Sequence, residues 1–437
     1  MDMGQPAASL DRSLLIVVAN FPQFFAMRPV MEGLKERGRP FSLHVPQNLG
    51  DGFAEIAASV LAALRDAGHQ PLTELEGDRP WQVVLEPYPQ MAACPRRYSI
   101  EYQYTTISSK PDPCYLPAQN ALFDAILCSN TYEHDALSVF GKTFLVGDLM
   151  SVGYVPRKQS HGDKPVLLYL PTWGQDNGIA GVASVLRELR ADYYAISKSH
   201  HGTDHLVAEA AAKAHLMDGF DESYDSTTPL LQLLERADVV LSDNSACVFQ
   251  CLYTGTPVAI FAADINARRL EGIDTLQHQL VRDGVIPYAC APTTIAQVLR
   301  DAVSPEQRQR QARAAADLFP ADRDRVVDTV VAVLEDYLHD RVSQTYTRFH
   351  RMYAEDGQRL RREVAELSSQ LAQAEQRTAP LRAQVAALTE ELAGVYDSRS
   401  WRLTAPLRRL VGLLADRPAL HGPSKAKGTT ATPSAVR

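Results

Sequence analysis

The chain has 437 residues, 45% hydrophobic and 22% charged, the proportions of a globular protein and not of a fibrous or wholly disordered one. This length exceeds one ordinary domain and suits two mid-sized domains with a further segment. Because 44 Lys and Arg stand against 52 Asp and Glu, the net charge is -8, which argues against nucleic acid as a partner.

Cysteine usage and the N-terminal residues restrict the class further. Six cysteines are spread through the sequence without a CxxC or a His/Cys cluster, so neither a zinc site nor a disulfide framework is predicted. No carboxylate pair of the kind that holds a catalytic metal stands out, and no metal or other cofactor is expected. Residues 1–12 lack the basic and apolar regions of a secretory signal, and no run of about 18 apolar residues occurs. We therefore expect a cytoplasmic protein that does not span a membrane.

Residues 1–155 alternate short apolar runs with helical patterns. Strands are expected at residues 14–20, 41–46, 81–87, 123–130 and 143–148, and helices at 27–38, 52–67 and around His134. Nearly continuous apolar strands of this kind are covered by helices on both faces of a parallel sheet. The alternation predicts a doubly wound, Rossmann-like domain.

Residues 156–340 repeat the pattern after a polar stretch, residues 155–165, that is typical of an interdomain linker. Strands and helices are expected within residues 164–173, 183–191, 193–202, 230–261 and 323–338. The fold class is therefore α/β, with two doubly wound domains.

Beyond residue 344 the periodicity changes. Between residues 345 and 396, apolar residues alternate spacings of four and three from Leu360 to Val395, a heptad seam that predicts a coiled coil and a homo-oligomer. The alternative is a helix that lies back on the globular body. Pro380 interrupts the seam and is expected either to kink the helix or to divide it into a hairpin.

The C-terminal residues form a different kind of segment. Residues 397–420 predict a basic amphipathic helix with Trp401 on its apolar face, which is typical of contact with a membrane surface or a partner. Packing on the rest of the chain is the alternative. Residues 421–437 are expected to be disordered. Residues 397–437 contain eight Lys or Arg and two Asp, a net +6, which leaves -14 for residues 1–396 and favours attraction to the anionic inner face of the cell membrane.

Polar residues follow three strands of the second domain, where ligands of doubly wound sheets bind. Neither a GxGxxG after the first strand nor a GxxxxGK[ST] occurs, which disfavours a dinucleotide redox site and a P-loop. At Ser242, Asp243, Asn244, Ser245 and Ala246 a strand ends and a helix begins. Hydroxyls and backbone N–H groups at such a point suit a diphosphate, although Asp243 or Ser245 as a simple helix cap is the alternative.

Two further segments have the same kind of position. Lys198 and His200 follow a strand, and a cation and an imidazole there can neutralise charge on a phosphate leaving group; a solvated loop is the alternative. Thr172 and Trp173 end the first strand of the second domain and are expected to line the gap between domains, although Trp173 as a core residue is the alternative.

These segments together resemble the C-terminal half of the CDP-glycerol glycerophosphotransferases, the teichoic-acid-polymerase-like family with a GT-B fold. The matching motifs are LPTW at residues 170–173, KSH at 198–200, AD at 237–238 leading into SDNSA at 242–246, and TPV at 256–258. The resemblance covers roughly residues 120–265. It implies a transferase that moves glycerol phosphate from a CDP-linked donor to the hydroxyl of a polymer or lipid-linked acceptor, in bacterial surface-polymer synthesis. It also implies that residues 242–246 bind the donor diphosphate while Lys198 and His200 neutralise the departing nucleotide.

The sequence departs from that family at two positions. The family's histidine base lies in a Trp-His-Gly turn of the first domain, and residues 98–113 contain no histidine, so Glu101 is the candidate base. The second serine of the family's Ser-Ser pair is Ala246. Two alternatives therefore stay open: a GT-B glycosyltransferase that uses a nucleotide sugar, and a degenerate GT-B scaffold that acts through its coiled coil. The run SRSWRLTAPLR, residues 398–408, resembles a module that follows coiled coils in bacterial surface-polysaccharide transferases.

Overall fold

The computed structural model describes residues 13–47, 54–75, 80–88, 91–102, 122–155, 164–174, 177–262 and 275–408. They divide between two compact units, residues 1–357 and 358–437. The predicted linker, residues 155–165, and the predicted disordered tail fall almost wholly outside the described residues. No helix among the described residues is long and apolar enough to cross a membrane.

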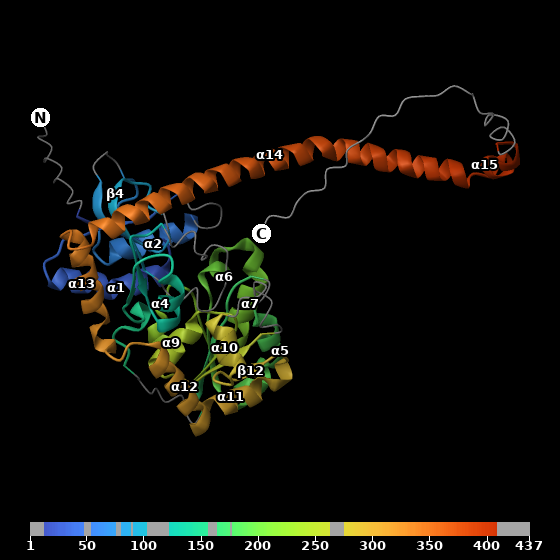
Figure 1. The fold of residues 1–437 in the computed structure, drawn as a ribbon. Helices are drawn as coiled ribbons and strands as arrows, with labels where there is room; N and C mark the ends of the chain where they lie inside the picture. The colour runs from blue at the N-terminus through green and yellow to red at the C-terminus, as the bar shows by residue number, and fades with distance from the viewer. Residues whose placement is uncertain are drawn as a thin grey trace, which may run out of the picture. The chain divides into compact units, whose positions relative to one another are not determined.

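The first six-stranded sheet is wholly parallel, with the order β2-β1-β3-β4-β5-β6 (Figure 1). Its strands are β1 (Leu14–Val17), β2 (Ser42–His44), β3 (Trp81–Glu86), β4 (Arg96–Tyr102), β5 (Ala125–Cys128) and β6 (Thr143–Leu145). Strands β1 and β5 are buried along their whole length, which explains why their sequences are continuously apolar. Strand β4 was not predicted, because its sequence alternates charged and aromatic residues and contains no apolar run.

Helices α1 (Phe21–Glu36), α2 (Ala54–Asp66) and α4 (Thr131–Leu137) and the short η2 (Leu149–Ser151) belong to this first sheet. Helix α1 begins six residues earlier than predicted. Asn20 Oδ1 accepts from the backbone N–H of Gln23 at 3.0 Å, and Gln23 Oε1 accepts from Ala19 N at 2.7 Å. This reciprocal cap satisfies the first N–H groups and extends the helix over a segment predicted as a loop.

The second sheet is also six-stranded and parallel, with the order β12-β11-β10-β7-β8-β9. Its strands are β7 (Val166–Leu170), β8 (Tyr194–Lys198), β9 (Glu222–Tyr224), β10 (Val239–Ser242), β11 (Val258–Phe261) and β12 (Tyr288–Ala289). Its helices are α5 (Ile179–Asp192), α6 (His201–His205), η3 (Val207–Glu209), α7 (Ala210–Gly219), α8 (Leu230–Leu234), α9 (Cys247–Thr254), α10 (Leu276–Arg282), η4 (Pro292–Thr294), α11 (Ile295–Val303) and α12 (Pro305–Leu318). Two doubly wound sheets confirm the predicted fold class.

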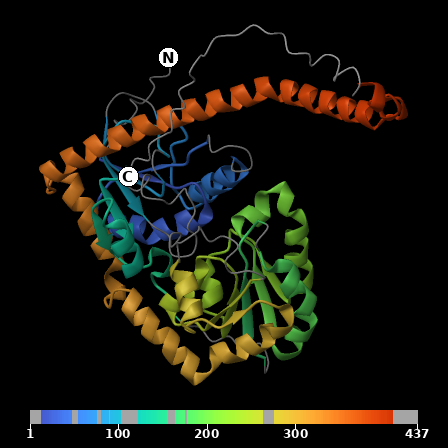
Figure 2. The ribbon, with the colours of Figure 1, turned by 45° about the vertical axis from the view of Figure 1, so that its right-hand side comes forward.

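The last helix of the body, α13 (Val326–Leu338), follows η5 (Arg323–Arg325) and packs on the first sheet, beside α1 (Figures 1 and 2). The side chains of Val330 and Leu334 are fully buried in the first core. Tyr337 meets the ring of Tyr98 edge-on, with centroids 5.1 Å apart. Helix α13 was predicted to end the second domain at residue 340, but it packs on the first sheet. The sequence of an apolar helix face does not show which of two sheets it covers.

Helix α14 (Gln344–Asp397) runs without interruption for 54 residues. Pro380 lies inside it, so of the two alternatives for this proline, a kink or a hairpin, the hairpin is wrong. The shorter α15 (Arg399–Leu403) follows, and the rest of the predicted basic helix, residues 409–420, lies outside the described residues.

Candidate functional site

The three predicted segments of the second domain meet at one edge of the second sheet. Strands β10, β7 and β8 are neighbours, and their parallel pairing aligns Ser242 with Leu170 and Tyr169 with Ser197. Their carboxyl ends therefore lie together and bring residues 172–173, 198–200 and 242–246 to the same edge. In a doubly wound sheet this edge, where the strand order reverses, is where ligands bind.

Asp243 ties the β10 end to the loop that follows β7. Its carboxylate accepts from the backbone N–H of Thr172 at 2.8 and 2.9 Å and from that of Gly178 at 3.2 Å. Ser242 also links the end of β10 to β7, because its hydroxyl donates to the carbonyl of Leu170 at 2.8 Å. Asp243 and Ser242 are fully buried, so they shape the site and do not themselves offer a donor to a phosphate.

The helix that follows, α9, begins without a side-chain cap. Its N-cap is Ala246, whose side chain makes no capping hydrogen bond, and the N–H groups of Val248 and Phe249 donate to the carbonyls of Ser245 and Ala246 at 3.4 and 3.0 Å. Ser245 Oγ lies 3.0 Å from the thiol of Cys247. Asn244 is 4% exposed, and its Nδ2 makes no hydrogen bond within the described part of the chain. An uncapped helix start beside a buried amide donor is chemically suited to an anion.

Lys198 supplies a positive charge at the same edge. Its Nζ donates to the carbonyl of Ser199 at 3.4 Å and forms no ion pair with a carboxylate of the described residues. Burial lowers its pKa to about 8, against the opposing effect of the carboxylates of Asp204 and Asp225. The ammonium is therefore protonated at neutral pH and costly to keep charged, and an anionic ligand would relieve that cost.

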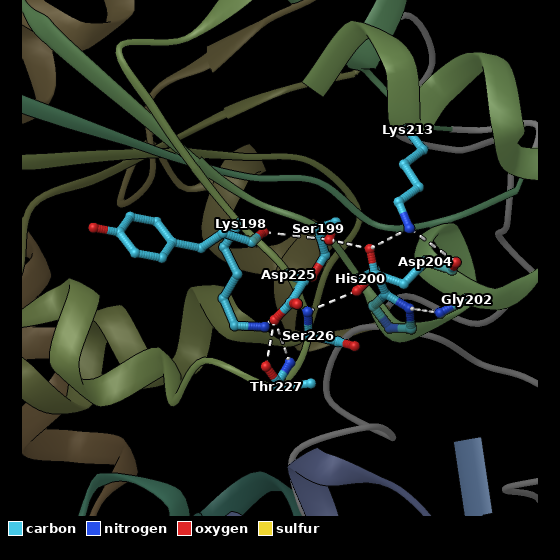
Figure 3. Close-up of polar contacts among 10 residues, drawn as sticks. Lys198, Ser199, His200, Gly202, Asp204, Lys213, Asp225, Ser226 and Thr227 are labelled. Carbon is cyan, nitrogen blue, oxygen red and sulfur yellow. Dashed lines mark hydrogen bonds and ion pairs between the residues drawn. The ribbon is translucent and has the colours of Figure 1, made fainter. Parts of the chain in front are cut away.

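The carboxylate of Asp204 fixes the loops on both sides of Lys198 (Figure 3). It accepts from Ser199 Oγ at 2.5 Å and from the backbone N–H of Ser226 at 2.6 Å, and Lys213 Nζ lies 3.8 Å away. Asp225, in turn, accepts from the N–H of Thr227 at 2.9 Å. These contacts join the carboxyl ends of β8 and β9 into one rigid wall.

His200 caps the short helix α6. Its Nδ1 accepts from the backbone N–H of Gly202 at 3.1 Å, so the neutral ring carries its proton on Nε2. Its ring packs against Trp173, with centroids 6.2 Å apart, and against His201, at 4.0 Å. A Cβ on Gly202 would lie 2.7 Å from the indole of Trp173, so only glycine allows this close approach. Trp173 and His200, predicted in separate segments, therefore pack together in one cluster.

Glu101 does not join this cluster, because it belongs to β4 of the first sheet. It is 3% exposed, and burial, reinforced by the carboxylates of Glu133 and Glu86, raises its pKa well above the ordinary value. Glu86 itself is paired with Arg96. Because only the ionised carboxylate accepts a proton, and this environment disfavours ionisation, these features disfavour Glu101 as the base.

Sequence reasoning missed two polar side chains at this edge. Gln277 on α10 donates through Nε2 to the carbonyl of Asp243 at 3.0 Å, while its buried Oε1 has no partner among the described residues. Ser226, 2% exposed, likewise has a hydroxyl without a partner there. Both lie outside the motifs, and only their position in the tertiary structure reveals them. No cluster of three or more His, Cys, Asp or Glu among the described residues has the geometry of a metal site.

The chain is similar to known proteins in fold alone. No protein-family model matches the chain, and no curated protein matches it in sequence. Among solved structures, MnaA from S. aureus with UDP is similar with 12% identity and a TM-score of 0.51, over 75% of this chain and 97% of that one. UDP-GlcNAc 2-epimerase from Neisseria meningitidis bound to UDP-GlcNAc has 12% identity and a TM-score of 0.50, over 74% and 100%. A variant of the wall teichoic acid polymerase TagF has 13% identity and a TM-score of 0.50, over 76% and 90%. The two-domain architecture is thus GT-B-like.

Proposed function

We propose that the chain is a GT-B transferase that binds a nucleotide-diphosphate-linked donor at the carboxyl edge of the second sheet. One observation carries the proposal. Three buried polar atoms at this edge, Asn244 Nδ2, Gln277 Oε1 and Ser226 Oγ, have no hydrogen-bond partner among the described residues, and the buried ammonium of Lys198 lies at the same edge. Each such atom costs about 1–3 kcal/mol if nothing bonds it. Anionic oxygens of a ligand would accept from Asn244 Nδ2 and offset the charge of Lys198, and a hydroxyl or amine of the same ligand would donate to Gln277 Oε1.

The reaction we propose is transfer of glycerol phosphate, or a related polyol phosphate, from a CDP-linked donor, most simply CDP-glycerol. The acceptor oxygen attacks the phosphorus that bears the glycerol, the bond from that phosphorus to the bridging oxygen breaks, and CMP leaves with the electron pair. Charge therefore develops on the departing phosphate. Lys198 and the Nε2–H of His200 neutralise it, since a preorganised cation and donor act most strongly on charge that forms in the transition state. The acceptor's proton passes to a base that is not assigned.

Glycosyl transfer from a nucleotide sugar is the second candidate. It is favoured by the position of the unpartnered atoms, which suit any nucleoside diphosphate, and by the departure from the glycerophosphotransferase pattern at Ala246. The acceptor in either case is a hydroxyl of a polymer or of a lipid-linked glycan.

A donor screen separates these candidates. The melting temperature of the purified chain is measured with CDP, UDP, GDP and dTDP, because a ligand that binds only the folded state stabilises it by about 2.7 kcal/mol at 100 times its Kd. We expect CDP to give the largest rise, and CMP to be released from CDP-glycerol in the presence of acceptor. A rise with UDP and none with CDP would favour the nucleotide-sugar reaction. No rise with any of the four would leave only the scaffold.

Two variants connect this result to the site. Asn244→Ala removes the buried amide without changing charge, and Lys198→Met removes the ammonium at similar volume; both should reduce the rise. Lys35→Met, on an exposed position of α1 in the first domain, is the matched control and should leave it unchanged. If the function of the chain in the cell survived His200→Ala but was lost on deletion from residue 360 onward, the chain would act as a scaffold and not as an enzyme.

We also propose that the C-terminal segment brings the enzyme to an anionic membrane surface. Trp401 is stacked under Arg408, whose guanidinium carbon lies 3.5 Å from the ring centroid, while Leu403 and Leu407 are 78% and 67% exposed. Exposed leucines beside an aromatic ring and arginines are typical of interfacial segments. Deletion of residues 397–437, with net charge +6, should reduce co-sedimentation with phosphatidylglycerol vesicles without changing donor binding. Equal sedimentation of both forms would refute the contact.

A further inference from the structure

Helix α14 presents a continuous apolar stripe to solvent. Its positions alternate spacings of four and three residues, with Ala374 and Thr378 between Leu371 and Leu381, and its large apolar members are 48–63% exposed: Leu360, Val364, Leu367, Leu371, Leu381, Val385, Leu388, Leu392 and Val395. A stripe with this 3.5-residue repeat is buried when two helices wind around each other. We propose that its partner is the same helix of a second copy, in the antiparallel orientation, with residue 364 of one copy opposite residue 395 of the other.

The sizes of the side chains favour this orientation. Two successive positions of the seam, Ala374 and Thr378, lack a large apolar side chain. In a parallel, in-register pair each faces its own copy, which places two poorly filled layers side by side at the centre. In the antiparallel register, Ala374 faces Val385 and Thr378 faces Leu381, so every layer contains at least one large apolar side chain.

The charges beside the seam favour it as well. In the parallel pair, Arg377 of one helix lies beside Arg382 of the other, twice by symmetry, and no opposite charges are paired at the equivalent flanking positions between residues 363 and 396. In the antiparallel pair, Glu375 lies beside Arg382 of the other helix, again twice, and Arg377 lies beside the neutral Gln384. One orientation therefore has two repulsive contacts and the other has two attractive ones.

Pro380 fits the same arrangement. It occupies a position on the outer face of the pair, away from the seam, and the helix continues through it. The twofold axis passes between residues 379 and 380, so the prolines of both copies lie at one level and any bend is shared. Residues 364–395 span about 47 Å, more than the three or four heptads that a stable coiled coil needs.

Charge reversals on the full chain distinguish the orientations, with the dimer Kd measured by sedimentation. Glu375→Arg should raise the Kd about tenfold, since it replaces two attractive contacts by two repulsive ones. The double variant Glu375→Arg with Arg382→Glu should restore the original Kd. Arg377→Glu is the matched control and should leave the Kd unchanged, whereas a parallel pair would be tightened by it and would not respond to Glu375→Arg.

Disulfide trapping gives a second, independent readout. Residues 371 and 388 face each other between copies in the proposed register, but lie 17 positions, about 25 Å, apart along one helix. A mixture of Leu371→Cys and Leu388→Cys chains should oxidise to a mixed dimer joined at these two positions, identified by peptide mapping. Dimers of each variant joined to itself at the same position would establish the parallel pair and overturn the proposal, as would a chain that sediments as a monomer or a trimer.

Discussion

Replacement of Lys198 by methionine should stabilise the folded protein while it weakens the donor site. The pKa of Lys198 falls from 10.5 to about 8 because the ammonium is buried. The folded state therefore binds this proton less tightly than the unfolded state, by at most about 3 kcal/mol, a cost fully present below pH 8. Methionine fills a similar volume without charge and removes the cost.

The sign of the pH dependence follows from the same two values. Between pH 8 and 10.5 the unfolded chain holds more protons than the folded one, so stability of the original protein rises with pH in this window through Lys198. The variant lacks this contribution. At pH 7 it should melt about 4 °C higher, given a body of 357 residues, and the difference should close toward pH 10.5.

Scanning calorimetry from pH 7 to 10.5 measures this difference, with Lys35→Met as the exposed control, which should show no pH-dependent difference. Titration with the nucleoside diphosphate should show weaker binding to the Lys198→Met variant by about tenfold or more. If the variant melted lower at pH 7, or if the difference in melting temperature did not change with pH, burial of the Lys198 ammonium would not destabilise the fold as argued.

Three further substitutions test the architecture of the site and the role of Glu101. Asp243→Ala leaves the backbone N–H groups of Thr172 and Gly178 without their acceptor. It should lower the free energy of unfolding by about 2–5 kcal/mol in urea denaturation and abolish donor binding. An unchanged free energy of unfolding would contradict a structural role for these hydrogen bonds. Gly202→Ala forces a methyl against Trp173 and should destabilise by about 1–3 kcal/mol and weaken donor binding, whereas Gly394→Ala, in open space on α14, should not. Glu101→Gln should lower turnover less than tenfold, because loss of a true general base costs about 10²–10⁴-fold. Since the raised pKa means that ionisation of Glu101 destabilises the fold as pH rises above 4.5, the Gln variant should gain stability relative to the original protein with increasing pH.

The most useful consequence of the site geometry concerns the role of Asp243. Its place in the motif suggests direct contact with the donor, but its carboxylate is occupied by the backbone of the neighbouring loop. If the proposed donor binds here, the groups that can contact its phosphates are the start of α9, Asn244 and Lys198. Substitution of a positioning residue such as Asp243 should therefore lower both stability and donor binding. Substitution of Asn244 should lower donor binding alone.

The periodicity of apolar residues along the sequence predicts much of the secondary structure and the fold class. The continuous apolar runs of β1 and β5 and the helical runs between strands specify two doubly wound sheets, because these periodicities depend only on which faces are buried. The polar residues after β7, β8 and β10 likewise predict one common edge, since parallel strands end on the same side. The 3.5-residue repeat from Leu360 to Val395 specifies a long helix with one apolar stripe.

Only the tertiary structure decided the remaining features, because each depends on contacts between residues far apart in sequence. Whether α13 covers the first or the second sheet depends on which surface complements its apolar face. Gln277 reaches the carbonyl of Asp243, and burial lowers the pKa of Lys198 and raises that of Glu101, through packing that no local pattern encodes. The sequence thus predicts which sheet edge collects the polar residues, and only the tertiary structure shows which of these side chains already have hydrogen-bond partners.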